Sequence, residues 1–209
     1  MYQKLTFTKW GAVALALGLF VTSALSSVVL HRNLQQLAKS ARRIFAGKCT
    51  SVSEHYQPNG DSPPYTEYTF EILESIKGNL GPTLTIRQYG LTKPKQVRQD
   101  LAYVGRVPGM PVYQEGKVYV LFLIGDSKLG LTSPAGLYQG AFLILEDSNG
   151  AKKVINGVSN LGLFKNLETA TLTLNKALSP TERVLMKNKK GPIDYEDFLS
   201  LVRKMVTKE

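Results

Sequence analysis

The chain has 209 residues, of which 43% are hydrophobic, and a formal net charge of +10 at pH 7. This composition supplies enough apolar mass for one packed domain with appendages and excludes wholesale disorder. Its single cysteine, Cys49, excludes an internal disulfide, so an apolar core must hold the domain together. The basic excess suits an anionic polymer, an anionic surface or an acidic protein, or it serves only solubility.

The N-terminus carries Lys4 and Lys9 ahead of residues 11–30, a run without a single charge. A basic start followed by an apolar run is typical of a secretory signal. Small residues near Ala24 and Ser26 would suit a signal peptidase, so residues 1–26 are the expected signal peptide. The run is also about 20 residues long, enough to span a bilayer, so an uncleaved anchor over 11–30 is the alternative. Both interpretations predict an exported protein that is periplasmic, extracellular or held at the membrane.

A short helix is expected within residues 27–42, because Leu34 and Leu37 lie one helical turn apart. The first strand is predicted over residues 43–52, which are rich in β-forming side chains. Cys49 falls in this strand. We expect a buried structural thiol there, because a reactive thiolate needs an accessible, electropositive setting.

The second predicted strand covers residues 65–75, where Tyr68, Phe70 and Ile72 alternate with polar side chains. Strict alternation of this kind indicates a strand with one face towards a core. Residues 83–89 alternate in the same way and form the third predicted strand. Glycine and proline between the two strands predict a turn.

Residues 90–113 form a long segment of mixed polarity, and such a loop on a compact domain is usually functional or mobile. Residues 117–124 are almost continuously apolar, which predicts a strand buried on both faces. The segments 140–146 and 152–158 are predicted to form a hairpin around Asn149-Gly150, a strong tight-turn signal.

Residues 159–209 are expected to form a C-terminal extension. It should end in a helix over 194–206, capped by Asp194 and carrying an apolar stripe towards the core. The part at 167–178 fits either a strand or a helix, and residues 182–190 are basic and are expected to be exposed.

Five segments carry a recurring pattern of glycines, aromatic and apolar residues. They are RIFAGKCTSV (43–52), YTFEILESIKG (68–78), VGRVPGMP (104–111), YQEGKVYVLFL (113–123) and GLYQGAF (136–142). Together they resemble a family of uncharacterised exported bacterial proteins, and the netrin-like or TIMP-like variety of the OB barrel. The resemblance implies a mainly β domain over residues 43–158, an antiparallel barrel of five to six strands between an N-terminal and a C-terminal helix.

No catalytic signature accompanies this pattern in the sequence. His31 and His55 are the only histidines, and neither belongs to a metal-binding motif. The glycines around Ser159 miss the spacing of a nucleophile elbow and are interpreted as a turn. TIMP-like inhibitors reach a protease zinc through an N-terminal cysteine, which this chain lacks near either expected mature terminus. We therefore expect a protein that is not an enzyme and has no cofactor and no metal.

The leading hypothesis is a non-enzymatic binding module of the cell envelope. Its partner would be an envelope protein or an anionic polymer; nucleic acid is disfavoured, and membrane contact is expected only through an uncleaved N-terminal segment. The candidate binding loop is defined by four cations, Lys93, Lys95, Arg98 and Arg106. The candidate rim consists of Tyr138 and Gln139, although the flanking Gly136 and Gly140 also indicate a bulge or a close backbone approach.

Two alternatives stay open. One is an OB domain that binds an oligosaccharide or a nucleic acid through a basic strand face. Its candidate residues are Tyr65, Tyr68, Arg87 and Tyr89. The other alternative is a protease-associated or inhibitor-like domain.

Overall fold

The computed structural model describes residues 30–57, 62–98, 101–103, 105, 107–167 and 178–206. The chain divides after Leu30, and the architecture below is that of the unit His31–Glu209. The predicted signal peptide or anchor lies outside the described residues. So do Arg106 and most of the ambiguous segment at 167–178.

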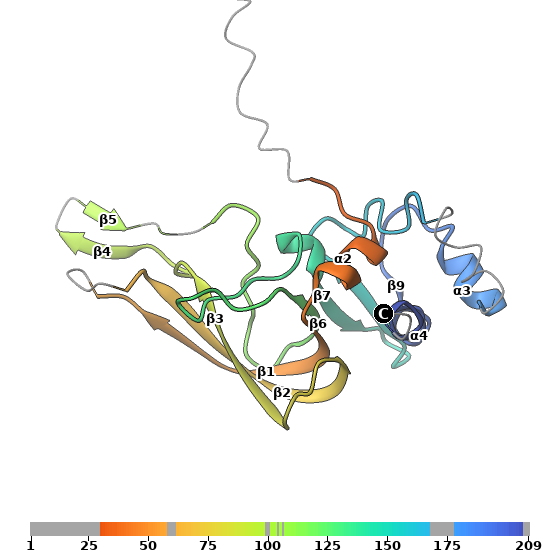
Figure 1. Ribbon diagram of the computed structural model, residues 1–209, viewed down its shortest axis with the longest axis horizontal. Helices are drawn as coiled ribbons and strands as arrows, with labels where there is room; N and C mark the ends of the chain where they lie inside the picture. The colour runs from red at the N-terminus through yellow and green to blue at the C-terminus, as the bar shows by residue number, and fades with distance from the viewer. Residues whose placement is uncertain are drawn as a thin grey trace, which may run out of the picture. The chain divides into compact units, whose positions relative to one another are not determined.

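The unit is built on one antiparallel sheet in the order β3-β2-β1-β6-β7-β8-β9, with a separate two-stranded pair, β4-β5 (Figure 1). Its strands are β1 (Arg43–His55), β2 (Tyr65–Lys77), β3 (Thr83–Tyr89), β4 (Lys95–Arg98), β5 (Leu101–Tyr103), β6 (Val118–Leu123), β7 (Ala141–Glu146), β8 (Lys152–Asn156) and β9 (Ile193–Asp194). Its helices are α2 (Leu34–Ser40), the 3₁₀ turn η1 (Leu137–Gly140), α3 (Pro180–Leu185) and α4 (Tyr195–Val206).

The prediction of a mainly β, antiparallel domain between two helices is confirmed, but the prediction of a closed barrel is wrong. The sheet has seven strands and two edges, β3 and β9, and no pairing among the described residues joins them. The outer edge of β3 is instead met by a loop, in which Thr132 N donates to Arg87 O (2.8 Å). Alternation and turns identify neighbouring strands, whereas closure depends on strand tilt and stagger, which the residue pattern did not reveal.

Strand β6 separates two hydrophobic cores, because successive side chains of a strand point to opposite faces. Tyr119, Leu121 and Leu123 pack into one core with the aromatic side chains of β1 and β2. Val120 and Phe122 pack into the other core, against α2 and α4. The prediction that this strand is buried on both faces is therefore confirmed.

Helix α4 closes the second core and begins where its capping residue predicted. Asp194 Oδ1 accepts from the backbone N–H groups of Glu196 (3.0 Å) and Asp197 (3.2 Å). Along the helix, Phe198 and Val202 are fully buried and pack into the second core. The C-terminal extension therefore belongs to the same core as the sheet.

The expectation that residues 182–190 are exposed is wrong at Leu185, which is buried in the core, and at Glu182, whose side chain is only 1% exposed. Ser179 and Glu182 form a reciprocal capping box at the start of α3. The Glu182 carboxylate also accepts from Lys204 Nζ of α4 at 2.6 and 2.7 Å. This buried ion pair joins α3 to α4.

The aromatic core behind β6 contains one hydroxyl without a hydrogen-bond partner among the described residues, that of Tyr113. Its ring packs edge-on against Tyr68 at 4.8 Å and Tyr119 at 5.2 Å between ring centroids. Burial raises the pKa of Tyr113 well above its ordinary value, so the hydroxyl stays protonated. The neighbouring Tyr119 differs, because its hydroxyl accepts from Gln114 N at 3.0 Å.

This contrast predicts opposite effects for two equivalent substitutions. Tyr113→Phe removes an unsatisfied buried hydroxyl and should raise the free energy of unfolding by about 1 kcal/mol. Tyr119→Phe removes a satisfied hydroxyl and should lower it by about 1 kcal/mol. Urea denaturation of both variants measures the difference; equal effects would contradict the assignment of the two hydroxyls.

Candidate binding site

The predicted binding loop is partly regular. β4 and β5 pair as an antiparallel hairpin, with Lys95 opposite Tyr103 and Gln96 opposite Ala102. Figure 1 draws this hairpin apart from the seven-stranded sheet, beyond the end of β3. Since the hairpin has only two strands of its own, its position must be fixed by the residues at its base.

The segment that leads from β3 into the hairpin is fixed by hydrogen bonds at Gly90 and Leu91. Gly90 N donates to Pro64 O (2.9 Å), and Thr66 Oγ1 donates to Gly90 O (2.8 Å). Leu91 N donates to Gly105 O (3.2 Å), which joins the outgoing and returning strands of the loop. The chain therefore leaves the sheet in one defined direction.

A single carboxylate organises the next two residues. Glu54 Oε1, at the end of β1, accepts from Thr92 N (2.7 Å), Thr92 Oγ1 (2.5 Å) and Lys93 N (3.2 Å). Desolvation of Glu54 opposes ionisation, but these hydrogen bonds and the charge of Lys95 outweigh it and hold the pKa of Glu54 below its ordinary value. The carboxylate is therefore charged at neutral pH and anchors the base of the hairpin.

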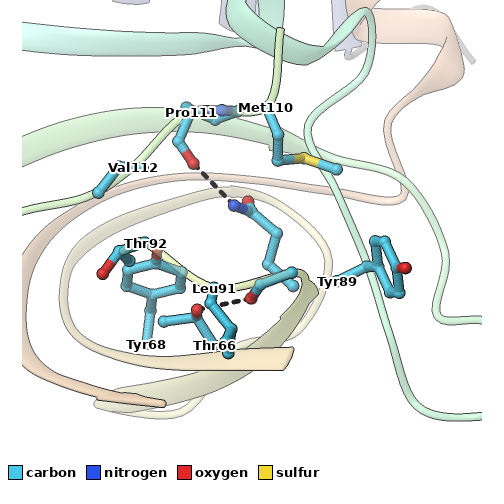
Figure 2. Close-up of a pocket in the computed structure, with 10 residues that line it drawn as sticks. Thr66, Tyr68, Tyr89, Leu91, Thr92, Met110, Pro111 and Val112 are labelled. Carbon is cyan, nitrogen blue, oxygen red and sulfur yellow. Dashed lines mark hydrogen bonds between the residues drawn. The ribbon is translucent and has the colours of Figure 1, made fainter. Parts of the chain in front are cut away.

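The segment that follows the hairpin packs over the sheet at Pro111. Gln88 Nε2 donates to Pro111 O at 2.7 Å, a bond drawn as a dashed line in Figure 2. Thr66, Leu91 and Met110 line a cavity beside it of about 10 Å³. A cavity of that size holds about one water molecule, so it cannot receive an organic ligand. The segments before and after the hairpin therefore pack against each other.

Cations and aromatic rings gather near the anchored base. Lys95 Nζ lies 5.9 Å from the centroid of the Tyr56 ring, and Arg87 Cζ lies 5.4 Å from that of Tyr65. The imidazole of His55 stacks on Tyr65 at 4.6 Å with an interplanar angle of 13°. Beside them is an open pocket of about 280 Å³, lined by Glu54, His55, Tyr56, Gln57, Ser62, Pro63 and Tyr65. Arg87 also pairs with Glu67 (3.1 Å), so the surface combines aromatic faces with both paired and exposed cations.

Two of the four predicted loop cations can be placed with their side chains. Lys93 and Lys95 are exposed and follow the Glu54 anchor directly. The backbone of Arg98 lies at the end of β4, while its side chain and all of Arg106 lie outside the described residues. Lys93 and Lys95 are therefore the described core of the candidate binding site.

The predicted rim residues lie elsewhere. Gln139, a predicted rim residue, is only 3% exposed, and its Oε1 accepts from Arg32 N at 2.7 Å, so its side chain belongs to the interior and not to an accessible rim. Tyr138 is half-buried, and its backbone N–H donates to Gly109 O at 2.9 Å. Both residues belong to η1, which connects the chain before α2 to the turns near Gly109 and Gly157.

Glu54 and Gln88, which hold the hairpin, were not anticipated. Glu54 follows Val52 on the core-facing side of β1, opposite the buried Thr66. An acidic residue at an apolar position of an alternating strand was the only signal for it in the sequence.

Among the described residues, neither the cysteine nor the potential metal ligands are arranged for chemistry of their own. Cys49 is fully buried, and this burial raises the pKa of its thiol, which disfavours a nucleophilic thiolate. Across the described ranges, no three His, Cys, Asp or Glu side chains are grouped as metal ligands. The same ranges contain no helix with the length and apolarity to cross a bilayer.

Comparisons of the chain with protein-family models, with curated proteins and with solved structures found no match.

Proposed function

We propose that this protein is a non-enzymatic binding module of the cell envelope, and that the β4-β5 hairpin and its anchored base form the contact surface. One observation carries the proposal. The charged carboxylate of Glu54 holds Thr92 and Lys93 through three hydrogen bonds and thereby fixes the base from which exposed Lys93 and Lys95 project. A preformed base lowers the entropy lost when a loop binds its partner.

The ligand class follows from charge and shape. By sequence, the segment from Gly90 to Arg106 carries four cations against one carboxylate, that of Asp100. The cavity at the hairpin base admits only water, and the neighbouring pocket is open, so contact would occur across a surface. An acidic protein face or an anionic polymer suits such a surface better than a small enclosed substrate does.

Binding of an oligosaccharide by the strand face is the second candidate function. Tyr65 and Tyr89 are cross-strand partners, and Arg87 lies over the Tyr65 ring on the same side of the sheet. Tyr68, which the sequence grouped with them, is 1% exposed and belongs to the core. If this face binds the ligand, Tyr89→Ala should abolish binding while loss of the loop charges leaves it intact.

The leading proposal predicts that binding depends on the four cations of the candidate binding loop. Changing Lys93, Lys95, Arg98 and Arg106 to serine should slow association about tenfold and reduce its salt dependence, because rim charges act mainly on the association rate. The measurement is capture from envelope extract by immobilised full-length chain, followed by association kinetics with the captured component.

A variant with the same change in net charge serves as the control: Lys48, Lys117, Lys128 and Lys152 to serine, all exposed residues that are not part of the hairpin or of the segments that lead into it. The control should bind as the wild type does. Equal binding by a folded hairpin variant and the control would mean that the loop cations contribute only to solubility.

A further inference from the structure

A second surface feature lies among residues that the binding site does not use. A groove of about 730 Å³ is lined by the apolar residues Leu161, Phe164 and Met186 and by the basic residues Lys165, Lys187 and Lys189. Leu161 is 57% exposed and so adds apolar surface beside the lysines. The lining of the groove therefore combines apolar side chains with positive charges.

The groove is built where the N-terminal part of the chain joins the domain. Leu34 N donates to Leu163 O (2.8 Å), and Asn33 Nδ2 donates to Lys165 O (3.0 Å). The backbone N–H of Gly162, a residue with φ +63°, donates to Lys189 O at 3.2 Å. These bonds tie the start of α2, the turn after β8 and the segment before β9 into one unit.

His31 marks the point where the N-terminal segment reaches this unit. Its imidazole lies against Gly162 so closely that a Cβ added to Gly162 would come 2.4 Å from Nε2 of His31. His31, the first residue after the run 11–30, is itself exposed and contributes to the lining of the groove. In the sequence, this groove residue directly follows the apolar run.

The three lysines that line the groove are exposed, and none of them forms an ion pair with a described carboxylate. The lining contains no acidic residue. The groove also lies far from the hairpin. Its residues follow β8 or precede β9, at one edge of the sheet, whereas the hairpin follows β3 at the other edge.

We propose that, in a chain that still carries residues 11–30, this groove contacts the surface of a bilayer with anionic phospholipid headgroups. The apolar run would insert, and since His31 directly follows it, the groove would be held at the headgroup layer. Lysines beside an inserted segment are attracted by anionic lipids, and an exposed apolar strip can enter the headgroup boundary. The hairpin, at the opposite edge of the sheet, would then remain available to a partner.

The test uses the full-length chain reconstituted into vesicles of phosphatidylcholine, with or without phosphatidylglycerol. The rate at which each lysine is acylated by a water-soluble reagent is read by mass spectrometry. With phosphatidylglycerol present, acylation of Lys165, Lys187 and Lys189 should fall about fivefold, because each lysine gains about 1 kcal/mol near an anionic surface. High salt should restore the rate, because it screens this attraction.

Lys48, Lys117 and Lys128, exposed residues outside the groove, are internal controls and should react equally in both vesicles. A variant with Lys165, Lys187 and Lys189 changed to glutamine should leave Leu161 accessible to oxidative footprinting in both vesicles, whereas the wild type should protect Leu161 in anionic vesicles alone. Equal lysine acylation in the two vesicles would overturn the proposal. So would protection in both that survives high salt, which would assign the groove to a second copy or to another protein.

Discussion

Replacing Gly140 by alanine should lower the free energy of unfolding by about 3 kcal/mol, because a new side chain there has no space. A Cβ on Gly140 would lie 2.3 Å from Ala135 O and 3.1 Å from Ala135 N. These are backbone atoms, and Ala135 N donates to Phe122 O of the central strand β6 at 2.7 Å. The clash therefore cannot be relieved by rotating a side chain, and relief would disturb the pairing of β6 with the turn before η1.

Gly81→Ala is the matched control, since a Cβ at Gly81 would meet no atom within 4 Å and its φ is not positive. It should change stability by no more than about 0.5 kcal/mol. Urea denaturation of both variants gives the comparison. If Gly140→Ala were as stable as Gly81→Ala, the close approach of the Gly140 and Ala135 backbones would be refuted.

Replacing Glu182 by alanine should lower the free energy of unfolding by about 3 kcal/mol, because it removes one partner of a buried ion pair. The carboxylate accepts from Lys204 Nζ, Ser200 Oγ (2.8 Å) and Ser179 N (2.7 Å). Lys204 is 32% exposed and can recover part of its hydration, which places the effect at the low end for buried pairs. The matched control is Glu196→Ala, an exposed carboxylate in the first turn of α4.

The same pair predicts a dependence on pH. Desolvation of Glu182 raises its pKa, but hydrogen bonds from Lys204, Ser179 and Ser200 outweigh this and lower the pKa below its ordinary value of 4.5. A carboxylate with a lowered folded-state pKa stabilises the fold above its unfolded pKa and loses that contribution as pH falls through the folded pKa. The stability difference between wild type and Glu182→Gln should therefore be constant at neutral pH and shrink below pH 4.5. A difference that grows on acidification would contradict the ion pair.

Local patterns in the sequence predicted the central elements of the fold. Tyr68, Phe70 and Ile72 alternate along β2 and do pack in one core. The prediction of a tight turn between β7 and β8 is also confirmed, since Asp147 N donates to Ala151 O at 3.0 Å. These elements were predictable because each depends on residues close together in the chain.

Long-range features could not be predicted in this way. β9 has only two residues, and it is a strand only because β8 lies beside it. Helix α3 is a different case. Ser179-Pro180 followed by Glu182 is a recognisable helix start, and the basic residues after it obscured that signal.

In the candidate site, too, features that depend on local sequence were predictable and features that depend on distant residues were not. Lys93 and Lys95 were predicted as exposed loop cations from local charge and polarity, and both are exposed. Their anchor was not predicted, because Glu54 and Thr92 are 38 positions apart in the chain and meet only after β1, β2 and β3 have paired. Residues that position a loop are commonly remote in sequence, since they belong to the scaffold that carries it.

The most direct test of the proposed binding surface is photo-crosslinking in intact cells that produce the full-length chain with a photoreactive residue in place of Lys95. If this surface binds a partner, position 95 should give one discrete adduct, which is lost when the other three loop cations, Lys93, Arg98 and Arg106, are changed to serine. The same photoreactive residue in place of Lys128, an exposed position outside the hairpin, should give no such adduct. No adduct from position 95, or the same adducts from both positions, would contradict a binding role for the hairpin.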